Sequence, residues 1–394
     1  MEWKEVDICQ LCDSVSETYK GNASEVVLIN TSDVLDGKCL NHEYVPNKKL
    51  KGQFKKTFRK GDILYSEIRP ANKRFCFVDF EPKDYIASTK LMVLRAHEDV
   101  APQYLYQILR SNDTLAQLQM LAESRSGTFP QITYSELSNI MVSLPSRKAQ
   151  KNIVSILSSL DRKIELNNKI NADLEEMAQA IFKNWFVDFE PFKDGKFVDS
   201  ELGMIPEGWK VGSPYEYVKV VYGAPYKSAK FNDNGEGLPL IRIRDLKDCN
   251  PQFYTPEILP QTEYVNMGDI VAGMDAEFVP HIWKGNTGLL NQRVCKLMPQ
   301  QTSISNLFVL YLMKPELEFV QSYKTGTTVS HLGKADIDKF VVVLPPLKVV
   351  EECSKILDSI LQRIKNISAE SRTLSTLRDT LLPRLMSGEL EVPE

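Results

Sequence analysis

Residues 144–189, LPSRKAQKNIVSILSSLDRKIELNNKINADLEEMAQAIFKNWFVDF, decide the fold. A proline and then Ser146, a typical N-cap residue, open the stretch, so we expect one long helix to begin here. Apolar residues recur at steps of three and four, the spacing of a coiled-coil seam, at Ile153, Leu157, Leu160, Ile164, Leu174, Met177 and Ile181. The same seam predicts that Asn167 and Asn171 are buried. A buried amide is tolerated when it pairs and fixes register, so a partner helix is expected.

The partner helix is predicted by a repeat about 200 residues further on. Residues 344–390, LPPLKVVEECSKILDSILQRIKNISAESRTLSTLRDTLLPRLMSGEL, repeat the design. The corresponding apolar positions are Leu357, Ile360, Ile364, Ile367 and Leu374. Upstream, residues 60–63 match 267–270, and Ser-Gly-Thr at 126–128 matches Thr-Gly-Thr at 325–327. The chain therefore reads as an internal duplication of a globular domain followed by a long helix, with the two helices antiparallel. A coil of about 36 residues would span about 54 Å.

The predicted fold is α+β, with two similar mixed α/β domains that contain small sheets and are separated by the two-helix coil. We expect a first globular domain at 1–145, a first helix at 146–189, a linker at 190–201, a second globular domain at 202–345, and a second helix with the C-terminal segment at 346–390. The alternative is two unrelated domains with ordinary amphipathic helices, which the shared upstream blocks disfavour. Trp185 and Phe186, just past the seam, are predicted to contact a partner subunit or the opposite domain.

Composition excludes several classes of protein. The chain has 394 residues, 43% of them hydrophobic and 25% charged, and a net charge of -4, which fits a water-soluble, two-domain protein. No apolar run approaches the length of a membrane span, and the first residues lack a signal sequence, so we expect a cytoplasmic protein. The 7 cysteines and 4 histidines suggest neither a disulfide framework nor a zinc cluster. For Cys9 and Cys12 we expect two small buried residues rather than a redox pair.

The densest cationic stretch is NKKLKGQFKKTFRK at 47–60, which holds no acid. Such a stretch suits phosphate contact; it could equally be a solvated loop anchored by Phe54 and Phe58. A polar loop follows at 66–75, where Arg69 could read a base edge or form a structural ion pair. The candidate DNA contacts in this domain are Lys48, Lys49, Lys51, Lys55, Lys56, Arg59, Ser66, Arg69, Asn72, Lys73, Arg74 and Gln131.

The second domain carries a different set of candidates. They lie mostly in loops that flank predicted strands near 239–244, 269–274, 288–297 and 340–344. The candidates are Tyr226, Lys227, Lys230, Arg242, Arg244, His331 and Lys334. Between the shared blocks the two domains hardly resemble each other, a pattern that suits two sites that recognise different things.

The sequence contains no motif for catalysis. A phosphate-binding loop, a dinucleotide fingerprint, a helical pair of metal-binding histidines and a nucleophile elbow are all absent. The segment from Asp79 through Glu81 to Lys83 could mimic nuclease metal ligands, but Pro82 interrupts it. We therefore expect no catalytic residue, no metal and no cofactor.

Two segments in particular carry a family resemblance. Residues 178–191, AQAIFKNWFVDFEP, and the ending at 381–390, LLPRLMSGEL, resemble the specificity subunit of type I restriction-modification systems. The resemblance covers essentially the whole chain. It implies a subunit that binds double-stranded DNA through two target-recognition domains, each reading half of a split target. It also implies that two modification subunits and, in the full complex, restriction and translocase subunits carry out adenine methylation and ATP-driven cleavage. No membrane and no small-molecule substrate are implied.

Two other classes remain open from the residues. One is a catalytic nuclease or methyltransferase, and the other is a coiled-coil scaffold that binds proteins without DNA specificity. Neither explains a repeated frame with divergent inserts as well as a DNA-reading subunit does. If both domains dock on one face of a duplex, the half-sites should lie about one helical turn, roughly 34 Å, apart.

Overall fold

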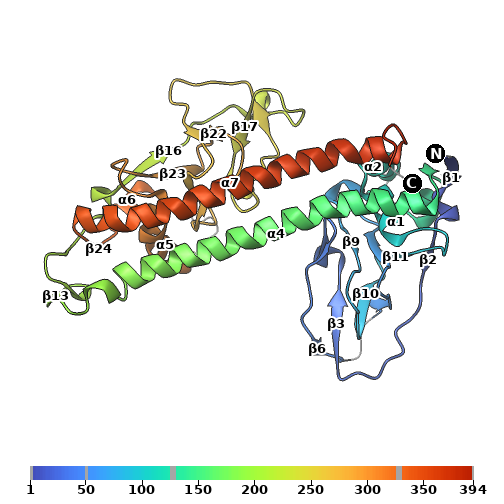
Figure 1. Ribbon diagram of the computed structural model, residues 1–394, viewed down its shortest axis with the longest axis horizontal. Coiled ribbons are helices and arrows are strands. Elements are labelled where there is room, and N and C mark those ends of the chain that lie inside the picture. The colour runs from blue at the N-terminus through green and yellow to red at the C-terminus, as the bar shows by residue number, and fades with distance from the viewer. Residues whose placement is uncertain (1–2, 49–51, 125–129, 325–330, 393–394) are drawn as a thin grey trace. The chain divides into compact units, whose positions relative to one another are not determined.

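The computed structural model describes residues 3–48, 52–124, 130–324 and 331–392 (Figure 1). The chain forms two compact units. Unit 1 comprises Met1–Arg162 and Leu374–Glu394, and unit 2 comprises Lys163–Thr373. Both contain small sheets and helices, as the predicted α+β class requires. The division differs from the predicted boundaries because each unit includes part of both long helices, which contribute apolar side chains to its core.

Unit 1 is built on two four-stranded sheets, in the orders β2-β11-β8-β9 and β6-β3-β10-β7, with a separate pair β1-β12. All neighbours pair antiparallel except β3 and β10, which are parallel. The small hairpin β4-β5 completes the strands. The strands are β1 Lys4–Asp7, β2 Cys12–Val15, β3 Glu25–Ile29, β4 Val34–Leu35, β5 Lys38–Cys39, β6 Val45–Pro46, β7 Phe54–Lys56, β8 Ile63–Ser66, β9 Phe75–Phe77, β10 Tyr85–Ser88, β11 Leu91–Ala96 and β12 Met141–Leu144.

Unit 2 repeats this topology. Its sheets have the orders β16-β23-β20-β21 and β18-β17-β22-β19, its strands β17 and β22 are parallel, and β15-β24 corresponds to β1-β12. A hairpin β13-β14 precedes them. The strands are β13 Phe197–Ser200, β14 Gly203–Pro206, β15 Lys210–Gly212, β16 Val218–Tyr222, β17 Leu238–Ile241, β18 Tyr254–Thr255, β19 Tyr264–Val265, β20 Ile270–Gly273, β21 Pro280–Ile282, β22 Gly288–Leu290, β23 Val294–Pro299 and β24 Val342–Leu344.

The single strand predicted at 288–297 is two strands, β22 and β23, in different sheets. The chain turns between them, where the backbone N–H of Val294 donates to the carbonyl of Asn291. The sequence pattern missed this turn because both flanks are apolar and β-branched or leucine-rich.

The shared blocks occupy equivalent turns in the two units. Gly61 precedes β8 with φ +90°, and Gly268 precedes β20 with φ +97°. Glycine adopts this left-handed conformation without the clash of a Cβ, which explains its presence in both copies. Asp62 and Asp269, one residue later, each accept a backbone N–H three residues upstream, from Arg59 and Asn266.

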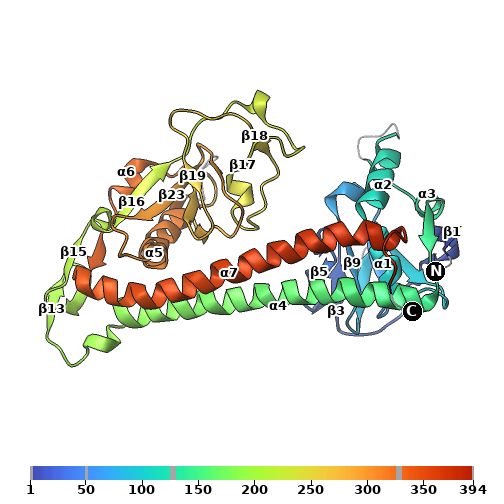
Figure 2. The same cartoon turned by 45° about the horizontal axis from the view of Figure 1, so that its top comes forward.

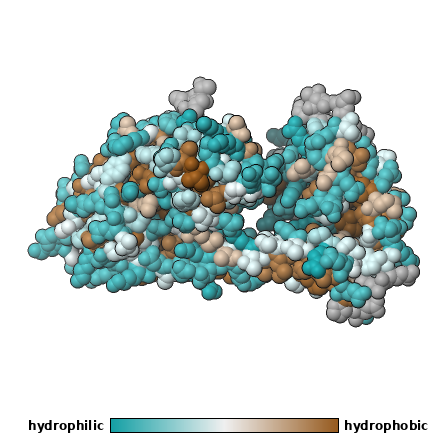
Figure 3. Space-filling model, turned by 90° about the horizontal axis from the view of Figure 1, so that it is seen from above, coloured by the Kyte–Doolittle hydropathy of each residue, from teal (hydrophilic) through white to brown (hydrophobic). Residues whose placement is uncertain are grey.

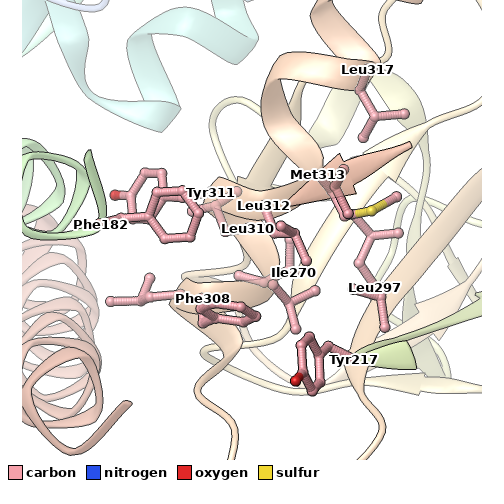
Figure 4. Packing of buried hydrophobic residues seen from close by; sticks show 14 of the residues in the cluster. Phe182, Tyr217, Ile270, Leu297, Phe308, Leu310, Tyr311, Leu312, Met313 and Leu317 are labelled. Carbon is pink, nitrogen blue, oxygen red and sulfur yellow. The ribbon is translucent and has the colours of Figure 1, made fainter. Parts of the chain in front are cut away.

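Short helices pack on each antiparallel sheet. In unit 1 these are α1 Pro102–Arg110, α2 Asn112–Ser124 and α3 Tyr134–Ser138, and in unit 2 they are α5 Asn306–Lys324 and α6 Lys334–Ile337. Phe308 of α5 lies in the core of unit 2 with ring centroids 5.7 Å from Phe182 and 5.9 Å from Tyr217 (Figure 4). These packed aromatic rings anchor the first long helix to this unit.

The two long helices are α4 Arg147–Phe186 and α7 Leu347–Met386. Within each unit they are antiparallel neighbours (Figures 1 and 2). In unit 1, Asp161 of α4 accepts from Arg378 of α7 at 2.9 Å and from Arg110 at 3.1 Å. In unit 2, Lys163 of α4 lies 3.3 Å from Glu370 of α7. The long helix pair predicted by the seam is therefore present.

Most of the predicted seam is buried, but Met177 is not. Leu157, Leu357, Ile360, Ile364 and Ile367 are buried, and Leu160, Ile164, Leu174 and Leu374 are partly buried. Met177 is 53% exposed, and Ala178 takes its place in the core of unit 2. From Leu174 the inward positions follow steps of four, through Ala178 and Phe182, because this part of α4 packs on a globular core rather than on one helix alone.

Asn167 and Asn171 are buried, as predicted, and both pair with α7. The Asn167 amide donates to Glu370 at 2.8 Å, and the Asn171 amide donates to the Ser368 hydroxyl at 3.0 Å. Both Oδ1 atoms and the Ser371 hydroxyl are buried without a hydrogen-bond partner among the residues that the structure describes. This polar layer favours one register, because a shift along the helix would leave the amides facing apolar side chains.

Trp185 and Phe186 lie within unit 2. Phe186 is buried, with its ring centroid 5.2 Å from Phe308 and 6.0 Å from Trp209. Trp185 is partly buried beside Phe192. Of the two predicted roles for this end of α4, contact with the second globular domain agrees with the position of Phe186, whereas a partner subunit could not reach that side chain.

Candidate nucleic-acid interface

The cationic stretch at 47–60 ends on the edge of a sheet in unit 1. Strand β7 is the last strand of its sheet, and Lys55, Arg59 and Lys60 are exposed on it or just after it, whereas the exposed Lys48 follows β6 at the opposite edge. Phe58 is buried and Phe54 is partly buried, so both aromatic residues anchor the stretch. Lys49 and Lys51 lie outside the described residues. The exposed cations could meet phosphate groups, while the aromatic residues serve the fold.

Lys56 is a structural residue rather than a free cation. Its ammonium group donates to the carbonyls of Thr89 at 3.1 Å and Leu91 at 2.8 Å. Partial burial lowers the pKa of this ammonium group. Lys56 therefore joins β7 to the start of β11 and the turn before it, and the prediction that it contacts phosphate conflicts with this geometry.

Two segments that the sequence analysis selected separately come together in unit 1. Ile68 and Gln131 form a β-bridge, Arg69 N–H donates to Pro130, and Ile132 N–H donates to Glu67. We call residues 67–73 and 130–132 the first loop pair. Arg69, Asn72 and Lys73 are exposed on it, and the Gln131 side chain accepts from Lys90 at 3.2 Å. The first loop pair thus gathers the side-chain types that read base edges and phosphates.

Two other candidates in this region are structural. Ser66 is buried, and its hydroxyl accepts the backbone N–H of Ile68 at 3.0 Å. The Arg74 guanidinium donates to the carbonyl of Ser32 at 3.0 Å. Both side chains shape the loop, so neither suits the predicted contact with DNA.

Unit 2 has a loop pair of the same backbone geometry. Asp275 and His331 form the bridge that Ile68 and Gln131 form in unit 1, and Leu332 N–H donates to Met274. Ala276 has φ +62°, and Arg69, at the matching position, has φ +45°. We call residues 274–280 and 331–332 the second loop pair. A glutamine from a helix supports each loop: Gln119 of α2 accepts from Ala71 N–H, and Gln321 of α5 accepts from Phe278 N–H.

The side chains of the second loop pair differ from those of the first. His331 Nδ1 lies 2.7 Å from one carboxylate oxygen of Asp275, and Arg293 Nε lies 3.3 Å from the other. Glu277 is exposed beside them. This surface mixes acids with a histidine and an arginine, whereas the first loop pair is cationic and amide-rich. A carboxylate can accept from the amino group of cytosine, so the two loop pairs suit different base patterns.

The remaining candidates of unit 2 divide into structural and exposed side chains. Tyr226 is buried and hydrogen-bonds Thr262 at 2.9 Å, and the Arg242 guanidinium stacks 4.3 Å from the Phe253 ring centroid. These two side chains support the fold, so their predicted contact with DNA conflicts with the structure. Lys227 and Arg244 are exposed.

Two further lysines of unit 2 are exposed but bound to carboxylates. Lys230 pairs with Glu257 at 2.9 Å, and Lys334 pairs with Asp338 at 2.8 Å. Hydrogen bonds from the backbone of Lys227 and from Lys230 lower the pKa of Glu257. Both lysines would have to leave a carboxylate to bind phosphate, which weakens them as candidates.

Two exposed lysines near these surfaces, Lys90 and Lys20, were not predicted from the sequence. Lys90 touches Gln131 and also lies 3.5 Å from Glu67. Lys20 follows Tyr19, whose backbone N–H donates to the carbonyl of Lys55 on β7. Neither stands in a cationic run, so only the pairing of distant segments identifies them.

The described residues hold no cluster of three or more His, Cys, Asp or Glu side chains that could bind a metal ion. Cys12 is buried, and burial raises the pKa of its thiol to about 12, whereas Cys9 is exposed. The expectation that both are buried is therefore wrong for Cys9. No helix in the described part of the chain is long and apolar enough to cross a membrane. On the face shown in Figure 3, hydrophobic side chains form scattered groups within a mainly hydrophilic surface.

Comparisons with known proteins agree with the duplicated frame. The family described as "Type I restriction modification DNA specificity domain" matches residues 2–176 and 206–374. The chain is 30% identical over 460 aligned residues to the Type I restriction enzyme HindI specificity subunit of Haemophilus influenzae, covering 99% of this chain and 100% of the relative. It is 26% identical over 390 residues to the Type I restriction enzyme MjaIX specificity subunit of Methanocaldococcus jannaschii, covering 90% and 85%.

A solved structure supports the fold. The crystal structure of the type I restriction-modification system S subunit from M. genitalium aligns with 100% of this chain and 97% of that one, with a TM-score of 0.50 and 14% identity. The resemblance drawn from residues 178–191 and 381–390 is therefore confirmed at the level of the family.

Proposed function

The chain belongs to the type I restriction-modification DNA specificity family, and from this premise we propose that it reads an asymmetric, bipartite target in double-stranded DNA. Each unit reads one half-site. The chain directs partner adenine-methyltransferase subunits, two per chain, and ATP-dependent restriction subunits to that target. The chemistry then belongs to those partners, and this chain supplies the sequence specificity.

One observation carries the proposal: the two loop pairs share a backbone and differ in side chains. The two loops are held in the same way. Each has a β-bridge at the equivalent place, a residue in the left-handed conformation and a supporting glutamine from a helix. A duplicated frame that served one partner surface alone would have no physical reason to vary its exposed polar side chains. Different polar side chains on the same frame are what two different half-sites require.

The exposed chemistry of each loop pair suggests how the half-sites are read. Arg69 and Asn72 are the residue types that make bidentate contacts with guanine and adenine, and Lys73 adds phosphate contact. In unit 2, Asp275 and Glu277 can accept from cytosine amino groups, and Arg293 can read guanine. We infer that the loop pairs enter the groove and that Lys55 and Arg59, at the β7 edge of the sheet, meet the backbone nearby.

Methylation mapping tests the proposed function directly. In cells that contain the complete system, single-molecule sequencing should reveal methylated adenines in one motif with two specified segments and an unspecified spacer. The two segments should differ from each other and lie about one helical turn apart. Deleting this chain should remove the methylation, and restoring it should bring back the same motif.

Two results would count against the proposal. A continuous, symmetric methylated site would contradict one half-site per unit. Methylation that persists without the chain would show that another protein supplies the specificity. If the chain acted as a protein-binding scaffold without DNA specificity, its loss would lower the amount of assembled complex but leave the sequence of the remaining methylated sites unchanged.

The isolated chain should bind DNA weakly. Its net charge is -4, and several candidate cations are bound to carboxylates or carbonyls within the chain. Few phosphate contacts release few counterions, so the dependence of affinity on salt concentration should be shallow. Tight specific binding by the purified chain alone would overturn this part of the proposal.

A further inference from the structure

The hydrogen bond from a helix to the reading loop joins the same two positions in both units. In unit 1 the backbone N–H of Ala71 donates to the Gln119 side chain at 3.0 Å, and in unit 2 the backbone N–H of Phe278 donates to the Gln321 side chain at 2.8 Å. Each donor stands three residues after the residue that forms the β-bridge of its loop. The two bonds are therefore equivalent in the duplicated frame.

The two glutamines also occupy equivalent places on their helices. Each follows a residue that packs in the core of its unit, Leu118 in α2 and Val320 in α5, and each stands four residues after a buried leucine. Residues four apart lie on nearly the same face of a helix, so the same rotation about the helix axis places both glutamines at the edge of the buried face. Helices α2 and α5 thus present a glutamine to the loop through one packing arrangement.

The bond does not depend on the side chains that the loop carries. Residues 67–73 and 274–280 share no residue type at any matching position, and the donor itself is an exposed alanine in unit 1 and a fully buried phenylalanine in unit 2. A glutamine oxygen can accept from the backbone N–H of any residue except proline. The glutamine is therefore a constant support for a loop whose side chains vary.

In unit 1 the bond holds the tip of a strained loop. Arg69 and Lys73 have φ of +45° and +52°, a left-handed conformation that costs free energy in residues other than glycine and persists only where the surroundings hold it. Backbone hydrogen bonds with residues 130 and 132 hold the start of the loop, whereas Ala71, between the two left-handed residues, is held from α2. Gln119 therefore fixes the part of the loop that carries the candidate reading side chains.

A second hydrogen bond orients the Gln119 amide. Its nitrogen donates to a carboxylate oxygen of Glu123 at 2.7 Å, one helical turn further along α2. The amide oxygen is thereby left for the loop, because an amide turned by 180° would bring its NH₂ group against the Ala71 N–H.

We propose that Gln119 and Gln321 are positioning residues that set the reading geometry of the two loop pairs. Resting on the proposed function, each glutamine controls recognition of the half-site of its own unit without contacting a base itself. A hydrogen bond to a base edge weakens steeply as its distance and angle change, so base discrimination requires a loop held in one place. A loop released from its glutamine keeps its side chains but accepts more than one base.

Methylation mapping of glutamine variants in the complete system tests this role. Gln119→Leu should relax one half-site and Gln321→Leu the other, with discrimination against a changed base falling about 10-fold, within the range of one lost base contact. Single-molecule sequencing should show added sequence variants in one segment of the methylated motif and none in the other. Gln117→Leu and Phe319→Leu, at exposed residues two positions before each glutamine, are matched controls and should leave the motif unchanged.

Conservative variants should retain the motif if the hydrogen bond is the cause. Gln321→Glu keeps an oxygen that can accept from the Phe278 N–H. Combining Gln119→Glu with Glu123→Gln keeps both hydrogen bonds of unit 1 and the same net charge, since the exchanged side chains still provide an acceptor for the loop and a donor for the carboxylate.

The outcomes separate this inference from the proposed function. An unchanged motif in both leucine variants would overturn the positioning role and leave the proposed function standing. A fall in methylation at all sites with the motif unchanged would show a structural role only, and relaxation that the conservative variants share would show that the bond is not the cause; both overturn the inference. A wild-type motif without two segments would contradict the proposed function itself. If Gln321→Leu fails to assemble, Gln119→Leu decides, because its hydrogen bond is exposed.

Discussion

The two loop pairs show how one frame can carry two different surfaces. Residues 67–73 with 130–132, and residues 274–280 with 331–332, share a β-bridge and a left-handed residue. The first presents Arg69 and Lys73, and the second presents Asp275 and Glu277. Because hydrogen bonds to backbone groups hold each loop, the exposed side chains are free to differ. Core substitutions should therefore lower the stability of either unit by a similar amount. Substitutions in a loop should alter DNA reading by one unit and leave stability unchanged.

The largest effects should come from the frame. Tyr104 of α1 and Phe308 of α5 are fully buried in the cores of units 1 and 2. Tyr104→Ala and Phe308→Ala should each lower the free energy of unfolding by about 3–5 kcal/mol, since each leaves a large cavity. Guanidinium denaturation measures this. Phe319→Ala, at an exposed phenylalanine of the same helix, is the control and should stay within about 0.5 kcal/mol. A loss under about 1 kcal/mol at either core position would contradict the prediction that both cores stabilise the shared frame.

The next effect concerns a loop. Arg69→Ala should weaken binding of the assembled complex to its target by about 10- to 100-fold, the range of one lost bidentate base contact. It should also relax the methylated motif in one half-site only. Lys4→Ala, at an exposed lysine of β1, which lies in a separate two-stranded sheet, is the control. If both half-sites relax together, the assignment of one half-site to each unit is wrong.

A smaller effect should come from the helix pair. In unit 1, Asp161 of α4 forms ion pairs with Arg110 of α1 and Arg378 of α7. In unit 2, the side-chain oxygens of Asn167 and Asn171 are buried without a hydrogen-bond partner among the described residues. Replacing both asparagines with leucine should raise the free energy of unfolding by about 1–2 kcal/mol, since unpaired buried oxygens are costly. It should also loosen register, seen as variable spacing between half-sites or altered oligomeric state. Asn168→Leu, at an exposed neighbour, is the control. Unchanged spacing and oligomeric state would count against the register role.

The smallest effect should be a pH dependence at the same layer. Hydrogen bonds from the Asn167 amide and Lys163 lower the pKa of Glu370 below its usual value. A lowered pKa in the folded state stabilises the protein above about pH 4.3, the usual value for glutamate, and this stabilisation is lost as pH falls through the folded-state pKa. The stability difference between wild type and Glu370→Gln should shrink between pH 6 and pH 3. A constant difference would contradict the shift, and Glu165→Gln on the exposed face of α4 is the control.

Several features follow from the sequence alone. The two long helices, the burial of Asn167 and Asn171, the duplication and some of the strands are visible in it, because they depend on periodicity and on repeated blocks. The family resemblance rests on segments such as 178–191 for the same reason. The exposed members of the candidate interface, such as Arg69 and Lys73, were found from residue type and loop position.

Only the tertiary structure decided which candidate side chains are exposed and which hold the fold together. Lys56, Ser66 and Arg74 stand in polar segments, yet their hydrogen bonds go to the chain itself. Lys90 joins Gln131 although 41 residues separate them. The burial of Ala178 in place of Met177 likewise depends on the core that α4 meets. The sequence gives the donors and acceptors of each side chain. Their hydrogen-bond partners belong to distant segments, which meet only when the chain folds.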